Sequence, residues 1–478
     1  MNPAHRQSYG FSNSPIKTAS NNQAEQEKEA AALTARGRLH EAALIYNDLI
    51  RNRTKNYTTY TSLAIIQGIQ GNHSEAKKLL KKSINLNPNS SQTYYNLGLT
   101  FENLGDTEAA IEAYERAIEI NPNDSESYVN LGGALSIMGN TEKAIVQFKK
   151  AIDLKPSFAE AHWNCSLAML ASGDYENGWE EYEWRNRRTQ KTAEPHAHPK
   201  CKRWEGEELP KGTKLLLVTE QGLGDTIQFM RYAITLQERG LDVSICAQPK
   251  LHSLIRSSGV STNPLSPTEA NQVTDGFWTP LLSVPKHLGI NPLNPCMNHP
   301  YIKVDRELAF KWEQILSLES KPIVGINWQG NPNSEHTGLK GRSLPLKAFS
   351  YIAEKNPNIS LLSLQKGYGS EQARNCSFKN MFVKCQSQIS NIWDFSETAA
   401  IIANCDLIIT SDTAVAHLAS GLGKPTWILL HKTPDWRWGT KGESTFWYQS
   451  ARLFRQQKDG NWRDVMHQAS DSLQKFFR

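Results

Sequence analysis

The sequence predicts a solenoid of helical repeats followed by an α/β region with parallel sheets. Three observations predict it. Small residues recur at a fixed spacing in the first third of the chain, short apolar segments alternate with helical segments from Lys214 onward, and 478 residues are too many for a single core. We therefore expect two or three domains.

A 34-residue repeat runs through residues 23–185. The positions that keep this step are glycines (Gly37, Gly71, Gly105, Gly139, Gly173), alanines (Ala42, Ala76, Ala110, Ala144) and prolines (Pro88, Pro122, Pro156). Small residues let paired helices approach closely, and a proline ends the second helix of each pair. The pattern predicts four to five helix–turn–helix units and resembles the tetratricopeptide repeat.

The segments that flank these repeats differ from them in composition. Residues 1–22 are rich in Ser and Asn and lack an apolar core, so we expect a disordered N-terminus and no secretory signal. The last repeat carries Trp179, Tyr182 and Trp184, which we expect to dock it onto the following domain, with a ligand platform as the alternative. Residues 186–212, with three prolines and a basic cluster, are predicted to be a linker.

The overall composition narrows the class of protein. No apolar run reaches the ~20 residues that a membrane-spanning helix needs. The seven cysteines form no C-x-x-C pair, which is typical of reduced thiols in the cytoplasm and indicates no zinc site. The net charge of +5, with its basic excess after residue 185, suits a small anionic ligand such as a nucleotide. We expect no nucleic-acid partner.

Alternating strands and helices predict two α/β halves after residue 212. Residues 306–320 indicate a bridging helix between an N-terminal half, 213–305, and a C-terminal half, 321–478. The predicted strands are Leu215–Val218, Val243–Ala247, Ile323–Asn327, Ser360–Leu364, Leu407–Thr410 and Trp427–Leu430, with helices between them, as at Thr226–Arg239 and Leu346–Lys355. Ligands of such sheets bind beyond the carboxyl ends of the strands, so the loops there are candidate sites.

A glycine turn, T-E-Q-G-L-G-D-T-I-Q-F, follows the first strand of the N-terminal half. Gly222 and Gly224 lead directly to Asp225, and Ile227 stands where a dinucleotide fingerprint has its third glycine. The second strand ends without an acid for a ribose, and no G-K-[ST] follows the turn. These departures argue against a nicotinamide dehydrogenase and against a P-loop enzyme. Asp225 alone is compatible with a helix cap or with chemistry.

A second informative stretch joins a buried strand to a helix around Asp412. Ser411 and Asp412 are candidate N-caps, Thr413 adds a hydroxyl, and His417 lies one turn further on the same side. A helix start beyond a strand offers free N–H groups and the positive end of a dipole to a phosphate. Taken alone, a helix cap explains Asp412 better than ligand contact does, and a partly buried helix position explains His417 better.

Several further motifs accompany these two stretches in order along residues 174–465. They are Gly178-Trp179-x-Glu181-Tyr182-Glu183-Trp184-Arg185, Trp328-Gln329-Gly330-Asn331-Pro332, Arg342-Ser343-Leu344-Pro345-Leu346, Ser363-Leu364-Gln365-Lys366-Gly367, Pro434-Asp435-Trp436-Arg437-Trp438 and Trp447-Tyr448. The ordered set resembles the glycosyltransferase family 9 domain, the heptosyltransferase-like group, in the form that follows tetratricopeptide repeats. The resemblance implies a GT-B fold, which is two Rossmann-like halves around a cleft. It also implies inverting transfer from a nucleotide-sugar donor, with no other cofactor. The absence of a D-x-D motif fits transfer without a metal.

The resemblance also implies roles for particular residues. It places the catalytic base at Asp225 and gives Gly222 and Gly224 the task of keeping the turn thin. It implies a donor-binding set at the second stretch and its surroundings: Arg342, Gln365, Lys366, Asp412, Thr413, Ala414 and His417. Arg342 stands roughly where heptosyltransferases carry a phosphate-binding lysine, although the two residue types are not equivalent. Ala414 departs from the glycine of the family's D-T-G pattern, and its Cβ narrows the approach of a phosphate.

We therefore predict a cytoplasmic, metal-independent, inverting glycosyltransferase. Its solenoid recruits a protein, glycan or lipid-linked acceptor, or binds a protein partner through its concave face. The alternative is a non-catalytic scaffold with a degenerate glycosyltransferase-like domain, which Ala414 favours and Asp225 disfavours. An enzyme of nucleotide-sugar metabolism, such as an epimerase, is a third possibility, but it would not need an acceptor-binding solenoid.

Overall fold

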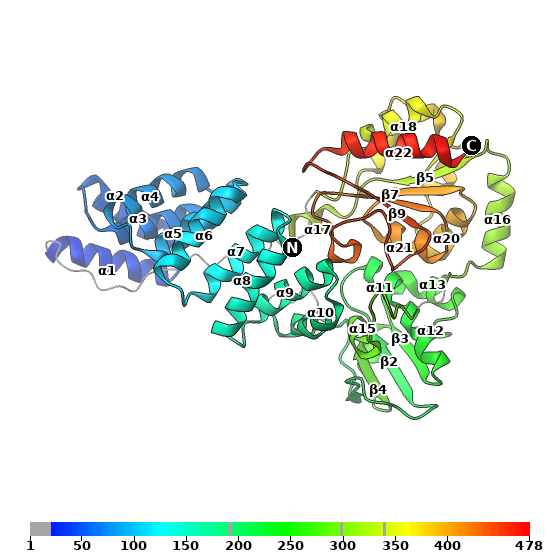
Figure 1. The fold of residues 1–478 in the computed structure, drawn as a ribbon, viewed down its shortest axis with the longest axis horizontal. Coiled ribbons are helices and arrows are strands. Elements are labelled where there is room, and N and C mark those ends of the chain that lie inside the picture. The colour runs from blue at the N-terminus through cyan, green and yellow to red at the C-terminus, as the bar shows by residue number, and fades with distance from the viewer. Residues whose placement is uncertain (1–20, 190–193, 297–299, 338–340) are drawn as a thin grey trace. The chain divides into compact units, whose positions relative to one another are not determined.

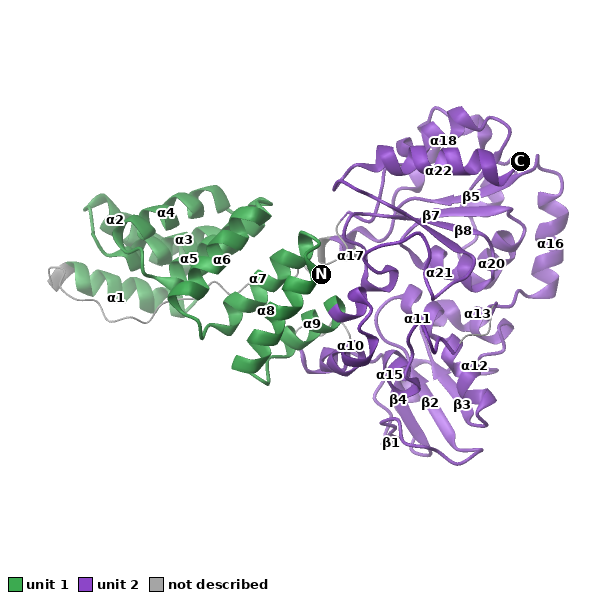
Figure 2. Ribbon diagram, viewed as in Figure 1, with its two compact units in different colours: residues 1, 3–168 green, residues 2, 169–478 purple. Residues whose placement is uncertain are grey.

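The computed structural model describes residues 21–189, 194–296, 300–337 and 341–478. They divide into two compact units, the first ending at Ala168 and the second spanning Met169–Arg478 (Figure 2). Residues 1–20 of the N-terminus expected to be disordered, and residues 190–193 of the expected linker, lie outside the described residues. The unit boundary falls within the last predicted repeat and not at residue 185, because the helix after Gly173 packs within the second unit.

Unit 1 consists of consecutive helix pairs (Figure 1). The helices are α1 Asn21–Ala35, α2 Leu39–Arg51, α3 Tyr57–Ile69, α4 His73–Leu86, α5 Ser91–Leu104, α6 Thr107–Ile120, α7 Ser125–Ile137 and α8 Thr141–Leu154, with α9 Ala159–Ser172 passing the unit boundary. The periodic glycines form the turn inside each pair, as at Gly105 with φ +78° and Gly139 with φ +80°. Only glycine adopts this left-handed conformation without strain. The predicted helical repeats are confirmed.

The seam between paired helices explains a second set of glycines. A Cβ added to Gly132 in α7 would lie 2.6 Å from Phe148 Cε1 in α8, and a Cβ on Gly98 would lie 2.4 Å from Tyr114 Cε1. Phe148 and Tyr114 are completely buried. The aromatic ring of one helix therefore occupies the space that the glycine of its neighbour leaves open.

Gly132→Ala is expected to destabilise unit 1. Overpacking a filled core costs about 1–3 kcal/mol, which exceeds the ~1 kcal/mol that alanine contributes over glycine within a helix. The neighbouring Gly133 is the matched control, since nothing lies within 4 Å of a Cβ added there. Thermal unfolding followed by far-ultraviolet circular dichroism should show a lower Tm for Gly132→Ala and an unchanged or higher Tm for Gly133→Ala. Equal shifts would contradict the seam as the cause.

Unit 2 contains two sheets in which every strand pair is parallel (Figure 1). The sheet of the N-terminal half has the order β1-β4-β2-β3, with β1 Lys202–Arg203, β2 Lys214–Val218, β3 Asp242–Cys246 and β4 Phe277–Pro280. The sheet of the C-terminal half has the order β6-β5-β7-β8-β9, with β5 Ile323–Asn327, β6 Ser360–Ser363, β7 Leu407–Ser411, β8 Thr426–Leu430 and β9 Ala451–Arg455. The predicted GT-B-like α/β fold is confirmed.

Helices connect these strands. Those of the N-terminal half are α11 Leu223–Phe229, α12 Arg231–Glu238, α13 His252–Ser257, α14 Pro267–Ala270 and α15 Val284–Leu288. The bridging helix is α16, Arg306–Leu316. Those of the C-terminal half are α17 Pro332–Thr337, α18 Ser350–Lys355, α19 Gln386–Ser390, α20 Phe395–Ala403, α21 Ala414–Gly421 and α22 Trp462–Phe476. Ahead of both halves, α10 (Tyr175–Tyr182) and the 3₁₀ turn η1 (Glu183–Arg187) also belong to unit 2.

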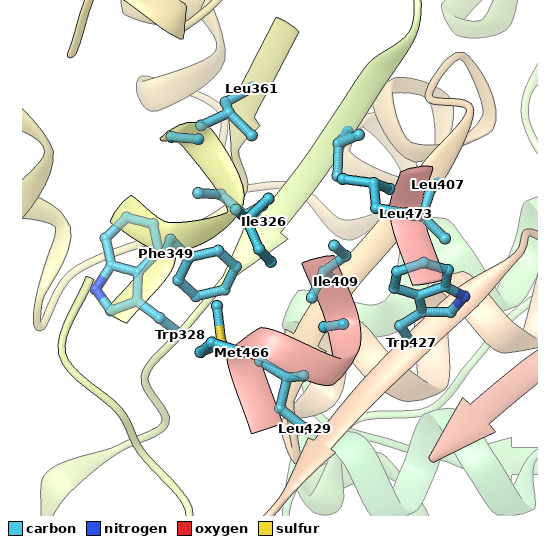
Figure 3. Close-up of a cluster of buried hydrophobic side chains, with 14 of the residues drawn as sticks. Ile326, Trp328, Phe349, Leu361, Leu407, Ile409, Trp427, Leu429, Met466 and Leu473 are labelled. Carbon is cyan, nitrogen blue, oxygen red and sulfur yellow. The ribbon is translucent and has the colours of Figure 1, made fainter. Parts of the chain in front are cut away.

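The core of the C-terminal half explains its apolar strands (Figure 3). Strands β5, β7 and β8 are buried at every position. Ile326 and Ile409 pack with Phe349 and with Met466 and Leu473 of α22 in one cluster of buried side chains. Fully covered parallel strands carry continuous apolar runs rather than alternation, and this is the pattern that made them predictable.

Three predicted elements differ from the structure. The single helix predicted over Thr226–Arg239 is two helices, with Met230 between α11 and α12. The predicted linker contains β1, which pairs with β4 at the sheet edge. Strands β4 and β9 were not predicted, because β4 ends in Pro280 and the edge strand β9 has an arginine at Arg452 and Arg455. Prolines and charges are typical of sheet edges and obscure the apolar pattern.

Candidate active site

The glycine turn after β2 holds Asp225 in the first turn of α11. The backbone N–H of Gly222 donates a hydrogen bond of 2.8 Å to Asp225 Oδ2. The other carboxylate oxygen, Oδ1, accepts a hydrogen bond from Arg437 Nη2 in the C-terminal half. The Asp225 side chain remains 19% exposed. Asp225 therefore caps a helix and also takes part in a charge pair, so the two interpretations of this residue are compatible.

The start of α21 lies beyond the carboxyl end of β7, as expected, but its cap differs from the prediction. Ser411 is still the last residue of β7, and Thr413 is the N-cap, so neither Ser411 nor Asp412 caps the helix. Thr413 Oγ1 accepts from Val415 N at 3.3 Å and donates to Asn327 Oδ1 at 2.9 Å. Strand β7 ends at Ser411, one residue later than predicted, and the N-cap of α21 is therefore Thr413.

The two helix starts meet at the junction of the halves (Figure 1). A Cβ added to Gly224 would lie 3.1 Å from His417 Cδ2 and 3.5 Å from Ala414 Cα. Gly224 thus lacks a side chain where α11 contacts α21. This contact brings the Asp225 turn and the predicted donor-binding helix together, although the two are almost 190 residues apart in the sequence.

A buried arginine connects the two halves at this point. Arg437, in the 3₁₀ turn η7 (Trp436–Trp438), donates to Gln228 Oε1 at 2.7 Å, to Asp435 Oδ1 at 2.8 Å and to Asp225 Oδ1. Its side chain is 8% exposed, and its guanidinium lies 4.6 Å from the ring centroid of Trp436. The sequence signal for this residue is the motif Asp435-Trp436-Arg437-Trp438, in which Arg437 follows an acid by two positions, but no role for Arg437 was predicted from it.

Asp412 is a buried acid, and the neighbouring Asp435 is partly buried, with 19% of its side chain exposed. Burial, and after it the Asp435 carboxylate, raises the pKa of Asp412 to about 6 against the opposing effect of Arg342. Burial opposes ionisation of Asp435 too, but Arg437 lowers the pKa of Asp435 below its usual value. Asp435 is therefore the acid of the pair that stays ionised, and Asp412 is the one that takes up a proton in mildly acidic solution.

His417 is neutral in this site. Its Nδ1 lies 2.8 Å from the Tyr448 hydroxyl, and its ring stacks on Trp438 with centroids 5.4 Å apart. Burial, with Arg437 and Arg231 nearby, lowers the pKa of His417 to about 3. A neutral, stacked imidazole offers no positive charge to a phosphate.

The structure separates the other three predicted donor-site residues. Arg342 lies beside the α21 start, where its Nη1 is 3.4 Å from the main-chain oxygen of Asp412. The side chain of Gln365 is instead hydrogen-bonded to backbone groups of two loops. Its Oε1 accepts from Trp328 N at 3.1 Å, after β5, and its Nε2 donates to Tyr368 O at 2.7 Å. Lys366 donates to the Ile389 carbonyl, and burial lowers its pKa to about 8.

Several buried polar atoms around this junction have no hydrogen-bond partner among the described residues. They are Gln228 Nε2, Arg342 Nε and Ser411 Oγ. Buried polar groups are normally paired, because an unpaired one costs about 1–3 kcal/mol. Their gathering around Arg437, Asp412 and His417 is what a site for a polar ligand requires.

The last repeat helix docks onto both halves of unit 2, which confirms its expected docking. Trp179 in α10 donates to the Ile290 carbonyl at 2.7 Å in the N-terminal half. Its ring meets Trp436 of the C-terminal half edge-on, with centroids 5.4 Å apart. Next to it, Arg185 makes a doubly hydrogen-bonded pair with Glu220, both bonds being 2.9 Å. Trp436 is thus a packing residue in this cluster.

Comparison with known families agrees with these features. Tetratricopeptide-repeat models match residues 57–90, 91–124, 113–146 and 132–173. The model of glycosyltransferase family 9 (heptosyltransferase) matches residues 349–460, which include Asp412 and Arg437. The chain carries tetratricopeptide repeats and a glycosyltransferase family 9 domain. Both resemblances seen in the sequence are confirmed, and they indicate glycosyltransferase activity together with protein interaction.

Individual relatives match parts of the chain. Protein FlbA of Caulobacter vibrioides is 24% identical over 334 residues, which cover 64% of this chain and 53% of FlbA. The chain thus spans about half the length of that relative. Among solved structures, MamA is 25% identical over 35% of this chain and 94% of its own, with a TM-score of 0.31. YrrB, described as a TPR protein with an unusual peptide-binding site, is 21% identical over 35% of this chain and 87% of its own, with a TM-score of 0.32.

The state of the cysteines, membrane-spanning helices and metal-ligand clusters concern the whole described chain. All seven cysteines are free thiols. In the part of the chain that the structure describes, no helix is both long enough and apolar enough to cross a bilayer. Within the same residues, no three side chains of the His, Cys, Asp or Glu types gather as metal ligands would.

Proposed function

We propose that this protein is an inverting glycosyltransferase that moves a sugar from a nucleotide-sugar to an acceptor hydroxyl without a metal ion. The contact between Gly224 and the Ala414–His417 turn carries the proposal, because it sets Asp225 beside the helix start proposed to hold the donor. A base and a phosphate site must lie this close for one sugar to pass between two substrates.

Asp225 acts as the general base in this proposal. Its carboxylate is oriented by the Gly222 N–H on one oxygen and by Arg437 on the other. It removes the proton of the acceptor hydroxyl, whose oxygen then bonds to the anomeric carbon on the face opposite the leaving group. The bond from that carbon to the diphosphate oxygen breaks, and the nucleoside diphosphate leaves with the bonding electrons.

The α21 start and Arg342 stabilise the departing diphosphate. The start of α21 offers the positive end of the helix dipole, although the N–H groups of Val415 and Ala416 already donate to Thr413. Arg342 adds a guanidinium whose Nε has no hydrogen-bond partner among the described residues, although it lies 3.7 Å from Glu335 Oε1 in an ion pair. Gln228 and Ser411 supply further unpaired polar atoms for the donor. The repeats of unit 1 recruit the acceptor, which is a protein, a glycan or a lipid-linked glycan, or an assembly partner.

A non-catalytic scaffold is the competing function. Two observations favour it: Ala414 adds a Cβ at the helix start, and Asp225 already has partners for both oxygens. Nucleotide binding separates the two accounts, because a scaffold has no reason to retain a donor site.

Thermal-shift titrations with UDP, GDP, ADP and CMP, with and without EDTA, test the proposal. One nucleotide should raise the Tm regardless of EDTA, since a ligand at 100 times its Kd stabilises the folded state by about 2.7 kcal/mol. Arg342→Ala should reduce this shift, whereas Arg374→Ala, an exposed arginine of the same half, should not. If no nucleotide at millimolar concentration moves the Tm of the wild type, the scaffold replaces the enzyme. A shift that EDTA abolishes would contradict metal independence.

A further inference from the structure

A second cavity in unit 2, which we name the η1 pocket, lies outside the candidate active site. Its volume is about 410 Å³, within the range typical of small-molecule sites. The residues that line it are Glu183, Trp184, Asn186 and Arg187 of η1, Arg203 and Glu205 at and after β1, and Lys286 of α15. The pocket therefore belongs to the N-terminal half and to the segment that docks on it.

The Asn186 side chain is the strongest sign of a ligand. Both its Nδ2 and its Oδ1 are buried, and neither has a hydrogen-bond partner among the described residues. An amide in this state leaves two donors and an acceptor unused at a cost of about 1–3 kcal/mol. Because neither atom is accessible to solvent, a ligand reaches them once the Asn186 side chain turns toward the pocket. A molecule that offers a donor and an acceptor side by side would then satisfy both groups at once.

The charges of the pocket disfavour a strongly anionic ligand. Two of its three cations have a carboxylate partner: Arg203 lies 3.0 Å from Glu183 and 3.2 Å from Glu205, and Lys286 lies 2.7 Å from Glu180. Arg187 lies over the Trp184 ring, 4.5 Å from its centroid. Paired cations attract a phosphate weakly. The lining instead mixes carboxylates, which only accept, with cations, which only donate, around one amide that does both.

We propose that the η1 pocket binds a neutral sugar residue. Each sugar hydroxyl both donates and accepts, so neighbouring hydroxyls match the Asn186 amide and the carboxylate and cation groups around it. The Trp184 ring provides an apolar surface for the C–H face of a sugar. A part of the acceptor glycan is the natural occupant, and this acceptor role rests on the proposed function, whereas sugar binding itself does not.

The pocket is physically connected to the turn that carries Asp225. Glu183 accepts from Arg185 Nη1 at 2.7 Å, and Arg185 is paired with Glu220. Glu220 precedes Gly222 by two residues in the turn after β2. One wall of the η1 pocket is therefore fixed by the same ion pairs that hold the start of the glycine turn.

Saturation-transfer NMR on the full chain, with glucose, galactose, mannose and N-acetylglucosamine as probes, tests the proposal. At least one sugar should bind saturably with a millimolar Kd, and Asn186→Ala should weaken it at least tenfold. Asn375→Ala, at an exposed asparagine of the C-terminal half, is the control and should bind like the wild type. Absence of binding by all four sugars at 50-fold excess over protein, or binding that Asn186→Ala leaves intact, would overturn the proposal.

Stability and nucleotide binding separate this site from the rest of the molecule. Asn186→Ala should not lower the Tm, because it removes an unpaired buried amide. A lower Tm would assign Asn186 a structural role and overturn the proposal. The nucleotide shift should be the same in Asn186→Ala and the wild type. If no nucleotide binds but a sugar still binds through Asn186, the proposed function fails while the sugar site stands.

Discussion

Asp225→Asn is expected to lower the rate of sugar transfer by about 10²–10⁴-fold, the contribution typical of a general base. The amide has the size of the carboxylate, and its oxygen can still accept from the Gly222 N–H, which now donates at 2.8 Å. It cannot take up the acceptor proton. Nucleotide binding should therefore persist while release of nucleoside diphosphate, measured by a coupled assay, falls.

Asp394→Asn provides a matched control for the loss of a negative charge. Asp394 is also a helix cap that contacts the other half, since it accepts from Glu397 N at 2.9 Å and from Ser253 Oγ at 2.6 Å. It should leave the transfer rate nearly unchanged. Equal losses in both variants would assign the effect to the junction between the halves. Full activity of Asp225→Asn would place the base elsewhere.

Arg185→Met is expected to destabilise unit 2 by about 3–5 kcal/mol, because it leaves a buried carboxylate without its counter-charge. The side chains of Arg185 and Glu220 are both 0% exposed. Glu220 would keep the Leu282 N–H as a hydrogen-bond donor, at 3.1 Å. Thermal unfolding should show the corresponding loss in the transition of unit 2.

Two further variants identify the cause of that loss. Arg185→Met combined with Glu220→Met removes both charges and should recover much of the stability, since apolar residues often replace a buried pair without net cost. Lys214→Met breaks the Lys214–Asp275 pair, whose side chains are 64% and 77% exposed, and should cost no more than about 1 kcal/mol. If the double variant is as unstable as Arg185→Met, packing rather than the unpaired charge explains the result.

Local patterns predicted most of the fold. The repeats could be predicted because equivalent residues recur in every unit at a fixed spacing. Gly105, for example, forms the turn of its helix pair with φ +78°. The buried strands β5, β7 and β8 follow from continuous apolar runs. Two strands were harder to predict: β4 lies between β1 and β2 but ends in Pro280, and β9 is an edge strand that contains Arg452.

The candidate site was predictable only in part, because its decisive contacts join distant segments. The turn at Asp225 and the helix start at Ala414 each have a local pattern, whereas Arg437 meets Asp225 across 212 residues. Nothing near Arg437 in the sequence specifies that partner. Gln365 also could not be placed from its local sequence. Its position after a strand suggested a ligand contact, but its side-chain amide accepts a hydrogen bond from the backbone N–H of Trp328. Thr413 and not Asp412 is the N-cap of α21, because β7 ends one residue later than expected.

The docking of α10 determines where unit 2 can be separated from the repeats. A truncated protein designed from the predicted domain boundaries would begin within or after the linker, residues 186–212. It would lack Trp179, Tyr182 and Arg185. Such a truncated protein would expose Trp436 and Phe446, which pack against α10. It would also leave Glu220 without its ion-pair partner Arg185. Exposed apolar patches and an unpaired buried acid both favour aggregation or unfolding. A fragment of unit 2 must therefore include α10 and begin before Tyr175, inside the predicted repeats, so the end of the repeat array is structurally a part of unit 2.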